Sequence, residues 1–173
     1  GPVAGDAARR GGLAKEISGH DASADVLNRA GKIGFCDSLH ADIGSCVKDA
    51  QLVILCAPVG ACRGIAERIA PSLAAGAILS DVGSVKGAVI RDVGALVPAG
   101  VHFIPAHPIA GTEYSGPDAG FASLFDGRWT ILTPVPGSDI AATLASVGLG
   151  AITAAATGKT IDYVKQKQNP SFS

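Results

Sequence analysis

The chain has 173 residues, of which 47% are hydrophobic and 17% are charged, and its formal net charge is −1. This length suits one domain with a sizeable core, and the apolar composition excludes an intrinsically disordered chain. The near-neutral charge, which includes no basic block, excludes the electrostatic signature of nucleic-acid binding. No apolar run reaches the length of a membrane span and no signal peptide opens the chain, so we expect a cytoplasmic protein.

The cysteines and the absence of methionine support two further expectations. The cysteines lack CxxC spacing, so we expect reduced thiols and no metal site; they are Cys36, Cys46, Cys56 and Cys62. The sequence contains no methionine and starts at Gly1. We therefore expect it to be incomplete relative to its gene.

Apolar periodicity and glycine punctuation predict the first elements. A short helix over residues 1–10 is followed by a short strand over residues 16–21. A second helix, over residues 24–30, is expected to stop at Gly31. The pattern of segment 33–42 is ambiguous and predicts no element.

The following elements are better defined. Residues 52–57 are continuously apolar, as buried parallel strands are. Next come a helix over 61–73, a strand over 77–82, a helix over 85–96, and strands over 101–106 and 129–134. Strands that alternate with helices at this spacing predict an α/β fold, namely a doubly wound, Rossmann-like parallel sheet with helices on both faces.

The sequence also suggests a division of the chain. We place a dinucleotide-binding domain, partial at its N-terminus, at residues 1–147. Residues 148–173 begin small and apolar and end polar, and we expect them to form an atypical, poorly ordered tail.

His107 follows the predicted strand 101–106 and opens a polar loop. Residues 107–116 are His-Pro-Ile-Ala-Gly-Thr-Glu-Tyr-Ser-Gly. Open α/β sheets place their chemistry outside the carboxyl ends of their strands, and a neutral imidazole suits proton acceptance near pH 7. A hydrogen-bonded structural histidine is the alternative. The dense polar loop, and a second polar turn at residues 81–86, favour the functional interpretation.

Asp21 ends the predicted strand 16–21. In dinucleotide-binding folds an acid at this place bonds the adenosine ribose, about 20 residues after a glycine-rich turn. Counting back from Asp21 reaches Gly1, which can be the last glycine of a fingerprint whose first part and preceding strand are missing. An exposed acid at a strand end is an equally good interpretation of Asp21 alone.

Two further turns are candidates for the same edge of the sheet. Ala57, Pro58 and Val59 leave a buried strand abruptly, because Pro58 lacks a backbone donor; they can line a cofactor groove or simply end the strand. Ser84 follows the next strand, and we expect it to be the N-cap of the helix that begins near Val85. Such a serine can also face a ligand.

These segments together resemble the nucleotide-binding half of the prephenate/arogenate dehydrogenase family. The resemblance runs from about Leu13 to Gly137, and residues 107–116 are its most specific part. It is carried by His107–Gly116, Ser80–Gly87, Cys56–Ala61 and Gly127–Pro134.

The resemblance implies an NAD(P)-dependent oxidative decarboxylation of prephenate or arogenate in tyrosine biosynthesis. It implies that His107 contacts the ring hydroxyl and helps remove its proton, and that Ser84 supports His107 beside the nicotinamide. Thr112 and Glu113 match residues of the substrate pocket, and the full-length family forms homodimers. Asp21, with no arginine beside it, favours NAD over NADP.

The chain departs from the family at both ends. The first strand and first fingerprint glycines are absent, and the residues after Gly148 do not resemble the helical domain that follows in the family. We therefore expect no turnover from these 173 residues alone. A truncated, inactive remnant of such an enzyme, or another nicotinamide-dependent dehydrogenase of the same fold, are the alternatives.

Overall fold

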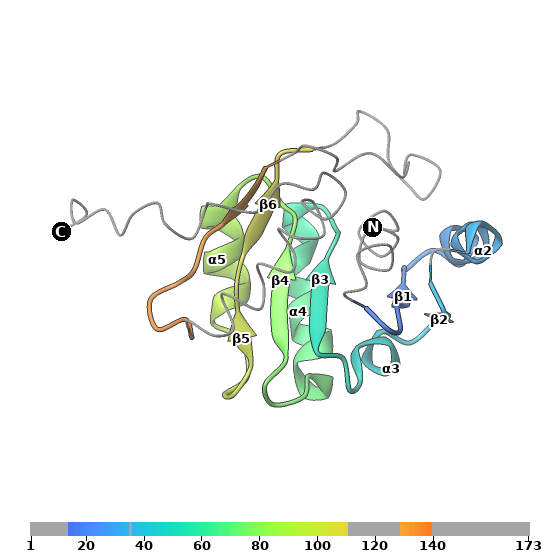
Figure 1. Cartoon of the computed structure of the whole chain (residues 1–173), viewed down its shortest axis with the longest axis horizontal. Helices are drawn as coiled ribbons and strands as arrows, with labels where there is room; N and C mark the ends of the chain where they lie inside the picture. The colour runs from blue at the N-terminus through green and yellow to red at the C-terminus, as the bar shows by residue number, and fades with distance from the viewer. Residues whose placement is uncertain (1–13, 35, 111–128, 140–173) are drawn as a thin grey trace.

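Figure 1 shows the computed structural model of the chain, which describes residues 14–34, 36–110 and 129–139. Its strands are β1 (Ser18–His20), β2 (Ser38–His40), β3 (Leu52–Leu55), β4 (Ile78–Asp81), β5 (His102–Phe103), β6 (Ala106–Pro108) and β7 (Thr130–Leu132). Its α-helices are α2 (Ala24–Ile33), α3 (Ile43–Val47), α4 (Cys62–Ile69) and α5 (Lys86–Gly94), with short 3-10 turns at Val59–Ala61 and Ala70–Ser72.

Parallel strand pairs dominate the described part of the chain. β1 pairs with β2 in parallel, and β3, β4 and β5 form a second parallel ladder in that order. Helices α4 and α5 pack against each other on one side of the ladder, with α4 behind β3 and β4 and α5 behind β5 and β6 (Figure 1). This arrangement confirms the expected α/β, Rossmann-like fold class.

The core lies between α4, α5 and the β3-β4-β5 ladder. On α4 the buried residues are Cys62, Ala66 and Ile69, a spacing that places them on one helix face. Val89 and Val93, one turn apart on α5, are fully buried. The strands contribute Val53, Leu55, Leu79 and Phe103 to the same cluster. The helical periodicity of the sequence thus decides which side of each helix meets the sheet.

The last predicted strand was expected to be parallel, and this expectation is wrong. β7 runs antiparallel to β6, with His107 opposite Ile131. The predicted strand 101–106 is also divided into β5 and β6, with Ile104 and Pro105 between them. β6 and β7 form a two-stranded sheet of their own. Apolar pattern indicates a strand but carries no information on its direction.

One local prediction near the start of the described chain also needs correction. Helix α2 does not stop at Gly31 but continues to Ile33. Gly34 then adopts φ 77° and its N–H bonds the Ala30 carbonyl, a left-handed cap that suits glycine. The ambiguous segment 33–42 contains strand β2.

Between β1 and β3 the described chain shows no strand-to-strand hydrogen bonds, so the two ladders are separate. Helix α3 contacts both β1 and α4 and connects the ladders by packing. No helix in residues 14–34, 36–110 and 129–139 is long and apolar enough to cross a membrane. The predicted helix 1–10 and the predicted tail 148–173 lie outside the described residues.

Candidate functional site

Most predicted site residues that the structure describes follow the carboxyl ends of strands, where parallel strands bring loops to one edge. His107 is the exception, because it lies within a strand and not, as expected, after one. Asp21 follows β1, Ala57 to Val59 follow β3, Ser84 follows β4, and His107 lies in β6. In Figure 1 this edge is the upper one for β3, β4 and β6.

His107 is the histidine that this edge presents. Its Nδ1 atom lies 3.4 Å from the Val82 carbonyl oxygen. A carbonyl can only accept, so Nδ1 carries the hydrogen, and in the neutral ring Nε2 keeps its lone pair. The ring is half-buried. This contact orients the ring, and a role for His107 as proton acceptor stays a prediction.

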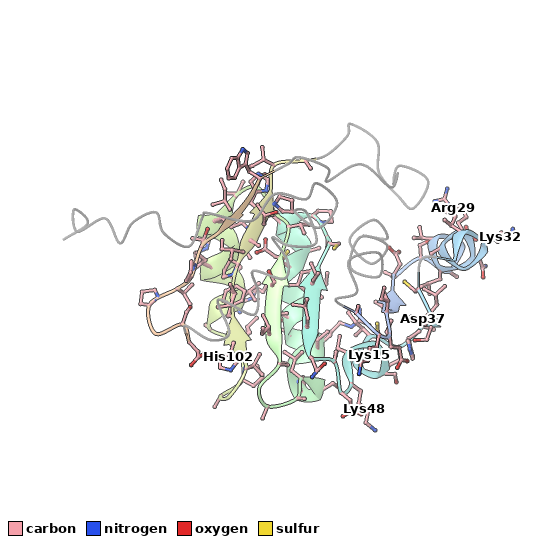
Figure 2. All side chains as sticks on the ribbon, viewed as in Figure 1. Lys15, Arg29, Lys32, Asp37, Lys48 and His102 are labelled. Carbon is pink, nitrogen blue, oxygen red and sulfur yellow. The ribbon has the colours of Figure 1, made fainter. Side chains whose placement is uncertain are left out.

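The other histidines have different surroundings. His20 Nδ1 bonds the His40 carbonyl at 2.9 Å, and His40 Nε2 bonds Ser38 Oγ at 3.0 Å, so both belong to the β1–β2 ladder. His102 begins β5 and lies at the lower edge of the sheet (Figure 2). His20 and His40 end β1 and β2, so it is the contact with the turn after β4 that distinguishes His107 from the three others.

Ser84 is not the N-cap of α5, contrary to the sequence-based expectation. Val85 occupies that position, without a side-chain capping bond. Ser84 is exposed in the turn between β4 and α5, two residues after the Val82 carbonyl that holds His107. The structure gives no hydrogen bond between Ser84 and His107, so support of one by the other stays a prediction.

The turns after β3 and β4 touch each other at Gly83. A Cβ atom on Gly83 would lie 3.0 Å from Val59 Cγ2 and 3.1 Å from Asp81 Oδ2. A side chain here would have to push the Val59 or Asp81 side chain aside by a few tenths of an ångström. The close approach at Gly83 brings the side chain of Val59, in the turn after β3, against the turn that carries Ser84.

Asp21 is exposed and follows β1 directly. Its Oδ1 atom accepts a hydrogen bond from the Ser23 N–H at 2.9 Å. Ser23 in turn caps α2, accepting from Val26 N. Helix α2 thereby fixes the carboxylate in place, while Oδ2 has no bond within the described chain.

A charged pair beside His107 was missed by the sequence analysis. Asp81 ends β4 and is fully buried, and Lys86 begins α5 with a side chain that is 14% exposed. The Lys86 ammonium contacts Asp81 Oδ2 and donates to the Ala106 carbonyl at 2.6 Å. The signal available in the sequence was a carboxylate and an ammonium five residues apart across a glycine turn.

Cys62 lies under the same edge. Its Sγ atom donates to the Pro58 carbonyl at 3.6 Å, and the side chain is 1% exposed. Burial raises the pKa of the Cys62 thiol, and the Asp81 carboxylate raises it further, while Lys86 opposes this. The thiol is therefore held in its neutral form as part of the core.

The remaining predicted site residues lie outside the described residues: Gly1, Thr112 and Glu113. Within residues 14–34, 36–110 and 129–139, no group of three or more His, Cys, Asp or Glu side chains could hold a metal ion.

Comparison with known proteins points to one family. A 43% identical relative, over 118 residues, is the cyclohexadienyl dehydrogenase of Zymomonas mobilis, and a 33% identical one is the prephenate dehydrogenase of Bacillus subtilis. These alignments cover 68% and 69% of the chain but 40% and 33% of the relatives. The chain thus spans well under half the length of these relatives.

Solved structures agree. The prephenate dehydrogenase of A. aeolicus, in complex with hydroxyphenyl propionate and NAD+, matches with a TM-score of 0.77 and 28% identity. The match covers 87% of this chain and 53% of the A. aeolicus chain. Arogenate dehydrogenase of Synechocystis matches with a TM-score of 0.76 and 28% identity. This match covers 88% of this chain and 52% of the Synechocystis chain. The family model described as "Prephenate dehydrogenase, nucleotide-binding domain" matches residues 4–147. The chain therefore belongs to the prephenate dehydrogenase family, as its nucleotide-binding domain.

Proposed function

We propose that this chain is the nucleotide-binding part of an enzyme that oxidatively decarboxylates prephenate or arogenate in tyrosine biosynthesis, with NAD as the hydride acceptor. The observation that carries the proposal is the bond from His107 Nδ1 to the Val82 carbonyl, which leaves Nε2 as an acceptor at the carboxyl edge. The relatives supply the substrate class, because they are named prephenate, cyclohexadienyl and arogenate dehydrogenases.

In this proposal His107 is the base that accepts a proton from the substrate. Nε2 accepts the proton of the substrate's ring hydroxyl while hydride leaves the carbon that bears it. The bond to the ring carboxylate then breaks and carbon dioxide departs. The electron pair of that bond makes the ring aromatic, and the former carbonyl oxygen takes a proton back from His107 to become the phenol hydroxyl. The Val82 carbonyl continues to accept from Nδ1–H when the ring becomes imidazolium. Bound NAD supplies the hydride-accepting chemistry.

The described residues fit a dinucleotide along the carboxyl edge. Asp21 offers a fixed carboxylate to the adenosine ribose, because one oxygen is held by Ser23 and the other has no partner in the described chain. Ala57, Pro58 and Val59 line the groove at the next turn. The anionic Asp21 favours NAD over NADP, since it repels a ribose 2′-phosphate. Gly1 is proposed as the last glycine of the phosphate-binding turn.

The remaining roles follow from the family. Ser84 lies beside the nicotinamide and the substrate, and Thr112 and Glu113 contact the substrate. We also propose that the full-length protein is a cytoplasmic homodimer.

The proposal can be tested in a chimera, in which the chain replaces the matching segment of the Zymomonas relative. His107→Asn keeps the size and one hydrogen bond but removes the base. The loss of a general base costs about 10²- to 10⁴-fold in rate, so kcat should fall by that factor while NAD affinity is retained. His102→Asn, at the opposite edge, is the matched control and should leave kcat unchanged.

Near-normal turnover of both substrates by the His107→Asn chimera would make His107 structural. A chimera that folds and binds NAD but is inactive with intact His107 would favour the alternative of an inactive remnant.

A further inference from the structure

We propose that Asp81 and Lys86 are positioning residues, which fix the orientation of His107 by holding the polar backbone groups of Ala106. The importance of this role for turnover rests on the proposed function of His107, but the positioning itself does not.

The free edge of β6 explains why side chains are needed there. Thr133 N bonds the Pro105 carbonyl at 2.8 Å, and Ile109 N bonds the Trp129 carbonyl at 2.7 Å. Residues 105 and 109 therefore direct their backbone groups toward β7. Alternate residues of a strand direct these groups to opposite sides, so Ala106 directs its own groups away from β7, toward the end of β4.

No backbone partner meets Ala106 on that side, because β4 ends at Asp81. Asp81 Oδ1 accepts from the Ala106 N–H at 3.3 Å, and Lys86 Nζ donates to the Ala106 carbonyl at 2.6 Å. The two side chains take the place of a neighbouring strand. They satisfy both polar groups of a fully buried residue, which would be costly to leave unpaired.

The consequence for His107 is direct. The Ala106 carbonyl belongs to the peptide plane that joins Ala106 to His107, so the bond from Lys86 limits the rotation of the His107 backbone. The Asp81 carboxylate also accepts from Gly83 N at 2.8 Å. This bond fixes the turn whose Val82 carbonyl holds the imidazole. One ion pair therefore holds both sides of the contact between His107 and Val82.

The burial of the pair supports a positioning role. The Asp81 side chain is fully buried and that of Lys86 is 14% exposed, and a buried ion pair is weak evidence for stabilisation because of its desolvation cost. The pair also has no net charge, so the imidazolium formed at His107 meets no uncompensated cation from Lys86.

Nuclear magnetic resonance of the 173-residue chain with ¹⁵N-labelled histidine tests the proposal without substrate or cofactor. Long-range proton–nitrogen spectra report the tautomer of the His107 ring, and hydrogen exchange reports the Ala106 amide. In the wild type the Nδ1–H tautomer should dominate. In Lys86→Met its share should fall at least threefold, and the Ala106 amide should exchange at least tenfold faster.

Arg63→Met is the matched control. It removes one positive charge and one ion pair, to Glu67, on the exposed surface of α4, and should change neither readout. Lys86→Arg keeps a cation that can reach Asp81 Oδ2 and the Ala106 carbonyl oxygen. This variant should therefore retain part of the preference of His107 for the Nδ1–H tautomer. Asp81→Asn keeps an oxygen for the Ala106 amide, so it should retain the amide protection better than Lys86→Met does.

A folded Lys86→Met variant with wild-type tautomer and exchange would overturn the proposal. If that variant does not fold, Asp81→Asn takes its place: a shifted tautomer in the folded protein supports the proposal, and an unchanged tautomer refutes it. Loss of folding in both variants would show a purely structural pair and would also refute it. None of these results depends on whether His107 acts in turnover, so the proposed function is tested separately.

Discussion

Gly83 lies so close to Val59 that a Cβ atom on Gly83 would come within 3.0 Å of Val59 Cγ2. This relationship joins the turns after β3 and β4, which carry the proposed cofactor groove and Ser84. Any side chain at position 83 must therefore displace the groove turn, or the buried Asp81 carboxylate 3.1 Å away.

Gly83→Ala should accordingly lower stability by about 1–3 kcal/mol, the usual cost of overpacking. Gly87→Ala, in the first turn of α5, is the control, because an added Cβ meets no atom within 4 Å there. It should raise stability by about 0.5–1 kcal/mol through helix propensity. Urea denaturation of the two variants measures both, and equal stabilities would mean that the two turns do not touch.

Asp21→Ala tests the proposed ribose contact in the chimera with the Zymomonas relative. Loss of a charged hydrogen bond costs about 1.5–3 kcal/mol, so NAD affinity should fall by about 10- to 150-fold. NADP affinity should fall less, because the repulsion of the 2′-phosphate is lost at the same time.

The control for this variant is Asp25→Ala, which removes an exposed acid in the first turn of α2. Calorimetric titration with both cofactors distinguishes the outcomes. If Asp21→Ala and Asp25→Ala bind NAD equally well, Asp21 serves only to hold Ser23 and the start of α2.

The described fold shows which features a single sequence can predict. Residues 52–57 were recognisable as a strand because they are continuously apolar, and β3 lies within them. β2 is three residues, Ser-Leu-His, with a single apolar side chain and no pattern to detect. The direction of β7 depends on its pairing with β6, a long-range contact that leaves no trace in the local pattern.

The candidate site also contains residues that the sequence indicates and residues that it does not. His107 was singled out because a polar loop follows an apolar run there; the structure places it within β6, and its role stays a prediction. Asp81 and Lys86 were not, because charged residues at the ends of elements are usually solvated. Their burial follows from the packing of β6 against the end of β4, which only the three-dimensional structure shows.

The alkylation rate of Cys56 can report whether NAD binds beside Ala57. It is exposed directly before Ala57, whereas Cys62 is buried. Iodoacetamide should alkylate Cys56 at least tenfold faster than Cys62 in the native protein. In the chimera, saturating NAD should slow the alkylation of Cys56 while leaving the rate at Cys62 unchanged. Mass spectrometry of the digested protein measures both sites, and full reactivity of Cys56 under NAD would place the cofactor away from this turn.

The buried Cys62 thiol should make stability depend on alkaline pH. Burial raises the pKa of this thiol above its ordinary value of about 9, so the folded state keeps the proton at a pH where the unfolded chain releases it. The unfolded state is then favoured as pH rises. Below pH 9 the thiol is protonated in both states and contributes no slope.

Cys62→Ala isolates this effect, because every other titrating group is common to both proteins. Between pH 9 and the folded-state pKa, the wild type should lose up to about 1.4 kcal/mol of stability per pH unit relative to the variant. Denaturation in urea at pH 8, 9, 10 and 10.5 gives the difference directly. Parallel curves over this range would mean that the thiol ionises as readily in the folded protein as in the unfolded chain, and that Cys62 is not sealed beneath the carboxyl edge.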